Sequence, residues 1–269
     1  MIKLQQNRCF MKIKSIKTFE NGFMRQSFAF GGEEGPDKFD SSILYRSNIQ
    51  NYLIDTGDDV ILVDTGVPSS FPVSEPDDDT PLFMGDVQFD YVEELKKLGY
   101  DKEDITKIIL THKHIDHSGE VQQFPNAKVY LSKTEAKELN YEGDNIEDVE
   151  FTDGTYHNFE KSQKIVDGVY LIEAIGHTTG NSLVIAEDDG LFYMFQGDIT
   201  YTDEALYENK LSVVYEDIEK ARETLDNVRE FVKNNPTVYL STHTPYGSEN
   251  LENKAIVDLE NPPECIYYE

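Results

Sequence analysis

Short apolar runs separated by turn residues recur along this chain and predict a sheet-rich fold. Residues 11–31 alternate apolar and polar positions at their start, which is typical of a strand. Residues 51–66 hold two apolar runs around a Gly-Asp-Asp turn and predict a hairpin. Six later apolar runs predict further strands, the fourth and fifth of them joined by a hairpin turn: residues 108–110, 127–131, 169–175, 183–186, 191–195 and 237–240.

Three segments carry helix signals. Residues 89–98 place apolar side chains on one face, and Gly99 follows as a stop signal. Residues 132–135 form a Ser-Lys-Thr-Glu capping-box pattern, which opens a helix. Residues 216–233 repeat apolar positions at helical spacing. Because two β-rich halves are each followed by helices, we expect an α/β (α+β) fold in which two sheets form a layered sandwich with helices outside.

Three stretches lack this periodicity and are expected to be loops. Residues 31–42 contain glycine and aspartate, and residues 140–160 are acidic without a clear pattern. Residues 68–86 contain four prolines and the acidic run Asp77–Asp79. Long loops in compact domains are commonly functional covers or disordered segments. For this last stretch we therefore weigh a lid over a site against a solvated insertion.

The charge of the chain limits the classes of function that it can have. The 269 residues carry a formal net charge of −28 and no basic cluster, so we expect a soluble protein that repels nucleic acid. No apolar run reaches the length of a membrane helix, and residues 1–8 lack the apolar core of a signal peptide. Cys9 and Cys265 lie near opposite ends and are interpreted as free thiols, which favours a cytoplasmic location.

A cluster of metal-ligand residue types directly follows the predicted strand 108–110. It contains His112, His114, Asp116 and His117 within six positions. Imidazole nitrogen and carboxylate oxygen are ligands of zinc and related divalent ions. Side chains two apart in an extended chain point the same way, so His112 and His114 could hold one ion. Asp116 and His117 are neighbours that should diverge, which leaves them free for a second ion.

Three more candidate ligands follow predicted strands in the second half of the chain. His177, Asp198 and His243 each come directly after an apolar run. If these strands lie in two packed sheets, their ends can meet at one rim, where a rigid scaffold holds side chains that stay open to solvent. His157 follows no strand and is assigned to a surface loop.

Seven ligands of these types are enough for two metal ions. They divide into two sets that share one bridging carboxylate: His112, His114 and His177 for one ion, Asp116, His117 and His243 for the other, and Asp198 between them. Two divalent ions about 3.5–4 Å apart acidify a bridging water to hydroxide, which is a nucleophile at neutral pH. Because structural zinc sites are closed and rich in cysteine, this set predicts a catalytic centre.

The complete set resembles that of the metallo-β-lactamase-fold hydrolases. The matching residues run from Asp64 to His243, which is most of the chain. The resemblance implies one domain over residues 1–269, built as a four-layer αββα sandwich. It also implies two divalent ions, generally zinc, at the rim of the sandwich, with Asp64 as a strand-end carboxylate that supports the ligands.

Within this superfamily, the ligand spacing is similar to that of the N-acyl homoserine lactone lactonases. In those enzymes a tyrosine three positions after the bridging aspartate contacts the substrate carbonyl or the leaving oxygen, and Tyr201 stands at that position. The resemblance therefore implies a catalytic role for Tyr201, and for Asp116 as a proton shuttle. The implied reaction opens a lactone ring by attack of the metal-bridging hydroxide on a small-molecule ester or lactone.

Other functions remain open at this point. A thioesterase of the glyoxalase II type shares the ligands, but residues 259–264 are acidic and offer no basic patch for glutathione. The net charge opposes a phosphodiesterase or a tRNA-processing nuclease. An exported β-lactamase often has cysteine in place of Asp198, and a flavodiiron protein tends to have a carboxylate in place of His114. Outside the enzymes, a metal-binding or ligand-sensing module without turnover is the alternative.

Overall fold

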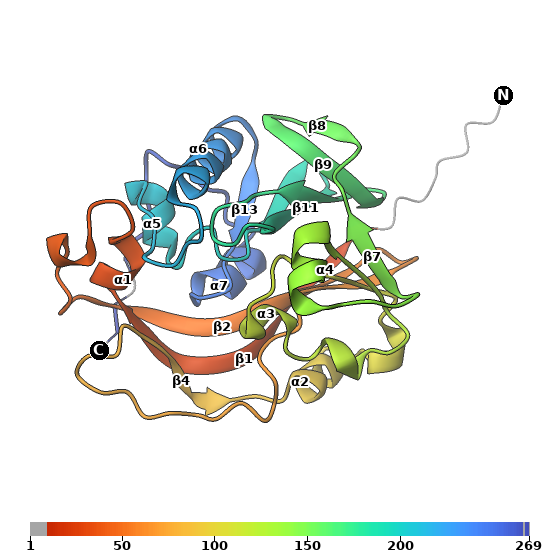
Figure 1. The fold of residues 1–269 in the computed structure, drawn as a ribbon, viewed down its shortest axis with the longest axis horizontal. Coiled ribbons are helices and arrows are strands. Elements are labelled where there is room, and N and C mark those ends of the chain that lie inside the picture. The colour runs from red at the N-terminus through yellow and green to blue at the C-terminus, as the bar shows by residue number, and fades with distance from the viewer. Residues whose placement is uncertain (1–9, 266, 269) are drawn as a thin grey trace.

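The computed structural model describes residues 10–265, 267 and 268, whose strands form two sheets (Figure 1). The predictions for residues 1–8 and Cys9 fall outside the described residues. The first sheet has the order β4-β1-β2-β3-β5-β6-β7: Leu82–Gln88, Lys12–Arg25, Leu44–Asp55, Val60–Val63, Lys107–Ile109, Lys128–Ser132 and Ile146–Val149. The second has the order β13-β12-β11-β10-β9-β8: Thr237–Leu240, Leu191–Phe195, Ser182–Asp188, Val169–Glu173, Phe159–Val166 and Gly154–Tyr156.

Strand direction decides which chain segments emerge side by side. In the first sheet, β3 and β5 pair in parallel, as do β5 and β6, and β6 and β7. In the second sheet, β12 and β13 pair in parallel, whereas the other neighbours are antiparallel. Since parallel strands end at the same edge, the chain after β5 emerges beside the chain after β3. The chain after β13 emerges beside the chain after β12 in the same way.

Helices cover the outer faces of both sheets. The structure contains seven α-helices in the described residues: α1 Gln26–Phe30, α2 Tyr91–Lys97, α3 Ile115–Ser118, α4 Lys133–Leu139, α5 Asp203–Glu208, α6 Ile218–Asn234 and α7 Tyr246–Asn253. Three short 3₁₀ turns lie at Pro36–Lys38, Lys102–Asp104 and Val121–Gln123. Figure 1 shows α6 outside the second sheet and α2 outside the first.

The buried apolar residues form layers that match this arrangement. Between the sheets, the rings of Tyr52 in β2 and Phe195 in β12 pack with centroids 5.2 Å apart. On the outer face of the second sheet, Leu225 and Phe231 of α6 pack in one cluster with strand residues such as Met194. A third cluster joins α2 and α4 to the outer face of the first sheet. The predicted four-layer αββα sandwich is confirmed.

Most of the predicted elements are present close to their expected positions. Strand β1 fills much of residues 11–31, and the hairpin at 51–66 is β2 and β3. The turn between β11 and β12 places Asp189 and Gly190 at φ values of 51° and 79°, as a hairpin with two left-handed positions requires. Helix α6 begins after Asp217, whose side chain accepts a hydrogen bond from the Lys220 backbone.

Three assignments were wrong because packing in the folded chain overrode a weak local signal. Residues 26–30 form α1 at the end of β1. The loop expected at 31–42 is present and includes one 3₁₀ turn. Residues 140–160 contain β7 and β8, which lie at the free edges of the sheets. Edge strands are half exposed, so their apolar alternation is weak.

The end of the segment at 68–86 is also a strand, because β4 begins at Leu82 and pairs with β1. The Arg25 guanidinium donates hydrogen bonds to the carbonyl oxygens of Thr80 and Asp78, both at 2.8 Å. These contacts hold the acidic part of the loop against the end of β1. A lid role for the remainder stays a prediction.

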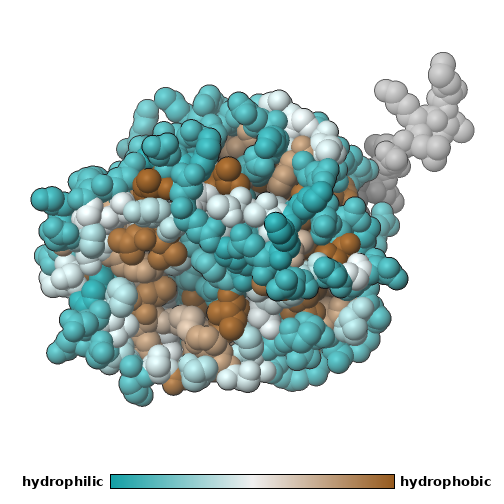
Figure 2. All heavy atoms as spheres, in the orientation of Figure 1, coloured by the Kyte–Doolittle hydropathy of each residue, from teal (hydrophilic) through white to brown (hydrophobic). Residues whose placement is uncertain are grey.

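The surface agrees with the acidic composition. Hydrophilic side chains cover much of the face shown in Figure 2, and apolar side chains gather mainly in its lower left and central part. His157 is exposed between β8 and β9, as its assignment to a surface loop predicts. Among the described residues, no helix combines the length and the apolar character that crossing a bilayer requires.

Candidate metal centre

Five of the seven ligand candidates lie in loops that follow strands, and Asp116 and His117 lie in the short helix α3. Thr111 and His112 follow β5, and His114 is the residue that precedes α3. His177 lies in the turn after β10, whereas Asp198 and His243 follow the parallel pair β12 and β13. Only a few residues separate each strand end from its ligand, so the two sheets fix the positions of these side chains.

Three imidazoles and a carboxylate form the first group. The Nε2 atoms of His112 and His177 lie 3.1 Å apart, and His114 Nδ1 lies 3.1 Å from the former and 2.9 Å from the latter. Asp198 completes the group, with Oδ2 3.5 Å from His177 Nε2. Ligands at about 2.0–2.1 Å from a tetrahedral ion would lie roughly 3.3 Å from one another. The observed separations are close to this value.

The second group shares Asp198 with the first. His117 Nε2 lies 3.0 Å from Asp198 Oδ1, and His243 Nε2 lies 3.1 Å from Asp198 Oδ2. Asp116 Oδ2 lies 3.6 Å from His117 Nε2 and 3.4 Å from His243 Nε2. The structure thus brings together all seven predicted ligands, in two groups with Asp198 between them.

The chemistry of these atoms fits a pair of divalent cations. His117 Nε2 and Asp198 Oδ1 are both buried, and neither has a hydrogen-bond partner among the described residues. A buried polar atom without a partner costs roughly 1–3 kcal/mol. A cation between the two groups would satisfy both atoms and would offset the negative charge of Asp116 and Asp198. The donor set, imidazole and carboxylate without cysteine, matches catalytic zinc and its neighbours.

Burial and charge set the protonation of the ligands. Burial lowers the pKa of His112 well below its ordinary value and lowers the pKa of His177 to about 4. Both rings are therefore neutral at pH 7 and present the lone pairs that metal binding needs. Burial acts in the same direction on His117, but the carboxylates of Asp198, Asp116 and Asp64 outweigh it and raise the pKa of His117 well above its ordinary value.

Asp64 supports the ligands from beneath, as the resemblance implied. Its Oδ2 lies 2.8 Å from His117 Nδ1, and its Oδ1 accepts a 2.8 Å hydrogen bond from the Thr111 backbone. The Thr111 hydroxyl lies 2.9 Å from Asp64 Oδ2 and 3.0 Å from His112 Nδ1. One carboxylate therefore orients a histidine in each group, directly or through Thr111. Asp64 has a φ of 63°, so this contact is made from the left-handed backbone region.

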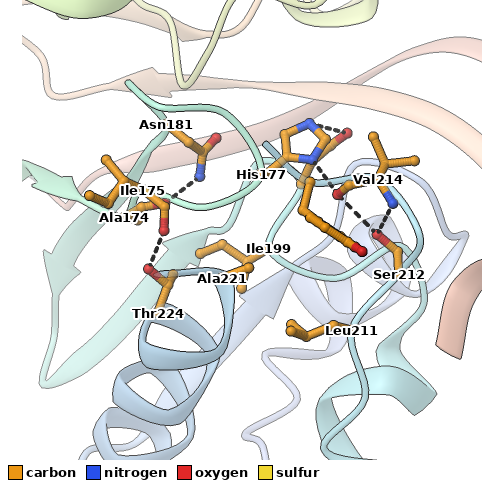
Figure 3. Close-up of a pocket in the computed structure, with 12 residues that line it drawn as sticks. Ala174, Ile175, His177, Asn181, Ile199, Leu211, Ser212, Val214, Ala221 and Thr224 are labelled. Carbon is orange, nitrogen blue, oxygen red and sulfur yellow. Dashed lines mark hydrogen bonds and ion pairs between the residues drawn. The ribbon is translucent and has the colours of Figure 1, made fainter. Parts of the chain in front are cut away.

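His177 is oriented by the chain before α6. Its Nδ1 lies 3.2 Å from the Val214 carbonyl oxygen, which accepts a hydrogen bond from the ring (Figure 3). A cavity of about 10 Å³ lies beside His177 and Asp198, next to Ile199 and Leu211. This volume has room for roughly one water molecule. The space beside His177 is therefore too small to hold a substrate.

Tyr201 lies buried beside the second group. Its ring stacks on that of His243 with centroids 4.6 Å apart and an interplanar angle of 21°. Burial and the charges of Asp198 and Asp116 raise the pKa of Tyr201 well above its ordinary value. The hydroxyl is therefore protonated at neutral pH and can donate a hydrogen bond to an oxygen that gains negative charge.

Two buried carboxylates that contact the ligand loops, Glu135 and Asp203, could not be recognised as functional from the sequence. Glu135 was interpreted only as part of a capping box, and Asp203 was not singled out. Glu135 accepts a hydrogen bond from Thr178, 43 residues away, and Asp203 accepts one from Ser241, 38 residues away. Neither separation leaves a local pattern. The one sequence signal is an acidic residue near the start of a helix, and it does not indicate which residues the carboxylate contacts.

Comparison with known proteins agrees with this geometry. The profile of the metallo-beta-lactamase superfamily matches residues 45–243. The chain is 30% identical to an N-acyl homoserine lactonase from Bacillus sp over 196 residues, which is 70% of this chain and 78% of that protein. It is 29% identical to an N-acyl homoserine lactonase from Bacillus cereus over 212 residues, 74% of this chain and 84% of that one.

Solved structures show the same fold at lower sequence identity. An N-acyl homoserine lactone hydrolase, with the product N-hexanoyl-L-homoserine bound at its catalytic metal centre, superposes with a TM-score of 0.67 at 22% identity. The match covers 92% of this chain and 97% of that one. AidC, a dizinc quorum-quenching lactonase, superposes with a TM-score of 0.62 at 18% identity over 89% of this chain and 92% of that one. The chain belongs to the metallo-beta-lactamase superfamily, and its relatives there include N-acyl homoserine lactonases.

Proposed function

We propose that this chain is a dinuclear metal-dependent hydrolase that opens the ring of acyl lactones such as N-acyl homoserine lactones. The observation that carries the proposal is the pair of ligand groups that share Asp198, with the protonated Tyr201 hydroxyl beside them. The similarity to the two Bacillus lactonases supports the choice of substrate.

In the proposed centre, each group would hold one ion and Asp198 would contact both. When bound, two divalent ions supply Lewis acidity and lower the pKa of a coordinated water. We propose zinc as the resident metal, because burial keeps the imidazoles of His112 and His177 neutral and neutral imidazole suits zinc.

The residues of the chain complete the reaction. Water adds to the ring carbonyl carbon, the bond from this carbon to the ring oxygen breaks, and the ring oxygen receives a proton. Tyr201 is placed to donate a hydrogen bond to the oxygen that gains charge. Asp116 is half-buried at the edge of the second group and is placed to pass a proton to the leaving oxygen.

The surface beside the ligands favours a substrate with an apolar part. Ile115 lies between His114 and Asp116 in sequence, and its side chain is 50% exposed. Tyr215 is also exposed, next to the Val214 carbonyl that contacts His177. Exposed apolar side chains next to a polar centre can contact an acyl chain while its lactone lies at the ligands.

A substrate screen on metal-loaded protein tests this proposal. The purified protein is analysed for metal and assayed on acyl homoserine lactones, short thioesters and phosphodiesters. Two bound ions with ring opening as the fastest reaction are expected. Faster cleavage of thioesters would favour the thioesterase instead, and two bound ions without any hydrolysis would favour a binding module.

Replacing Tyr201 with phenylalanine tests its proposed role. We expect kcat on lactones to fall roughly 10²- to 10³-fold, because a donor to developing negative charge is lost. The KM and the metal content should stay near those of the wild type, since the ring still packs on Phe28 and His243. Steady-state kinetics with elemental analysis measure both. A kcat within threefold of the wild type would rule the role out.

We further propose that residues 1–269 work as one cytoplasmic domain. The core between the sheets joins Ile54 and Ile61 of the first sheet to Val184 and Leu240 of the second, so neither half has a complete core alone. Cys265 is a free thiol that donates to Glu204, which suits a reducing compartment.

A further inference from the structure

Glu135 lies beneath the loop that carries His177. Its side chain is fully buried in α4, and Oε1 accepts hydrogen bonds from the Thr178 hydroxyl at 2.6 Å and from the Gly180 backbone at 3.0 Å. A Cβ at Gly180 would lie 2.7 Å from this oxygen, so the loop rests directly on the carboxylate. Glu135 thereby fixes the backbone on the C-terminal side of His177.

Asp203 plays the corresponding part beneath the loop that carries His243. It is buried at the start of α5, and Oδ1 accepts hydrogen bonds from the Ser241 hydroxyl and, at 2.8 Å, from the Thr244 hydroxyl. Its Oδ2 accepts a 3.2 Å hydrogen bond from the Asn250 side chain in α7. Ser241 and Thr244 flank His243 on both sides, so the carboxylate ties the two ends of the ligand loop together.

Neither carboxylate forms an ion pair within 4 Å in the described part of the chain, and the nearest cation that acts on Glu135 is the more distant Lys113, whose own ion pairs are with Glu138 and Glu216. Burying a carboxylate without a cation is costly, and hydrogen bonds from its surroundings must offset the cost. In both cases the donors come mainly from a ligand loop. These bonds offset only part of the cost, because burial still raises the pKa of both carboxyl groups and Glu135 Oε2 has no hydrogen-bond partner among the described residues. The bonds that do form hold each loop in one position.

The contact between Asp203 and its loop is especially important for the orientation of the His243 ring. The Nδ1 atoms of His117 and His177 contact Asp64 and the Val214 carbonyl, respectively. His243 Nδ1 is buried and has no hydrogen-bond partner among the described residues. The orientation of this ring therefore depends on its backbone and on the Tyr201 ring stacked against it. Gln50 Nε2 in β2 donates hydrogen bonds to the carbonyl oxygens of Ser241 and Thr244, and Asp203 accepts hydrogen bonds from the hydroxyls of the same two residues.

We propose that Glu135 and Asp203 are positioning residues, each dedicated to one metal ion: Glu135 places His177 for the first ion, and Asp203 places His243 for the second. The inference rests on the proposed dinuclear centre. It predicts that loss of either carboxylate weakens the binding of one ion and leaves the binding of the other unchanged. Partners that orient metal ligands typically contribute 10- to 100-fold to metal affinity.

The test measures metal affinity site by site in metal-free protein titrated with zinc against a competing chelator. His243→Ala leaves only the first site, and His114→Ala leaves only the second. Glu135→Met should raise the Kd of the first site about 10- to 100-fold and leave the second within about twofold. Asp203→Leu should do the reverse. Each variant thus serves as the control for the other, and Glu208→Gln, an exposed carboxylate of α5, should change neither Kd.

Conservative variants separate positioning from general support of the fold. Glu135→Gln and Asp203→Asn keep a carbonyl oxygen that accepts from the loop hydroxyls, so both should restore most of the affinity. If the apolar variants do not fold, Thr178→Val and Thr244→Val remove one donor from the loop side and should show the same site selectivity. Equal weakening of both sites, or no weakening of either, overturns the inference. Wild-type protein that binds fewer than two ions overturns the proposed centre itself.

Discussion

Replacing Asp198 with asparagine should remove most of the activity and the ability to hold two ions together. Asp198 is the one side chain common to both ligand groups, with Oδ1 3.0 Å from His117 Nε2 and Oδ2 3.1 Å from His243 Nε2. Asparagine keeps the shape, but it loses the charge and one of the two accepting oxygens. A loss of about 5 kcal/mol of transition-state stabilisation corresponds to a kcat/KM roughly 10³- to 10⁴-fold lower.

Steady-state kinetics on an acyl lactone and elemental analysis of the same sample measure both effects of Asp198→Asn. We expect about one ion per chain or fewer, with a circular dichroism spectrum like that of the wild type. Glu208→Gln, which exchanges an exposed carboxylate for its amide, is the matched control and should leave both quantities unchanged. A variant with two bound ions and more than a tenth of wild-type kcat/KM would contradict the bridging role of Asp198.

Removal of the metal should lower the stability of the folded chain by a similarly large amount. Without cations, the buried carboxylate of Asp198 and the half-buried carboxylate of Asp116 lie in one cluster, and their negative charge is not fully compensated. An ion at 1,000 times its Kd stabilises the native state by about 4 kcal/mol. In a domain of this size, each kcal/mol shifts Tm by about 2–4 °C, so two ions at this saturation should contribute about 16–32 °C.

Thermal unfolding with and without a strong chelator measures this shift, and added zinc should restore the original Tm. The double variant His112→Ala with His243→Ala removes a ligand from each group and provides the control. Its Tm should be lower from the outset and should not respond to the chelator. An unchanged Tm for the chelated wild type would show that these residues hold no metal that stabilises the fold.

The local pattern of apolar and polar residues was sufficient to predict the central strands and the amphipathic helix. Strands such as β3 and β12 are buried on both faces, so they appear as continuous apolar runs between turn residues. Helix α6 shows its buried face as a repeat at helical spacing, with Leu225 and Val228 fully buried. The edge strands β7 and β8 escaped prediction because contact with a single neighbour decides them, and their exposed positions carry acidic or polar residues.

The chemistry of the centre is already visible in the order of the residues: His112, His114, Asp116 and His117 lie so close along the chain that only a few conformations are open to them. The same order also places His177, Asp198 and His243 at strand ends. That these strand ends meet could be known only from the folded chain, since the pairing of β12 with β13 and the packing of the two sheets join residues far apart in the sequence. The same applies to the partners of Glu135 and Asp203. A local pattern records which face of an element is buried, whereas a hydrogen bond across 43 residues exists only after the core has packed.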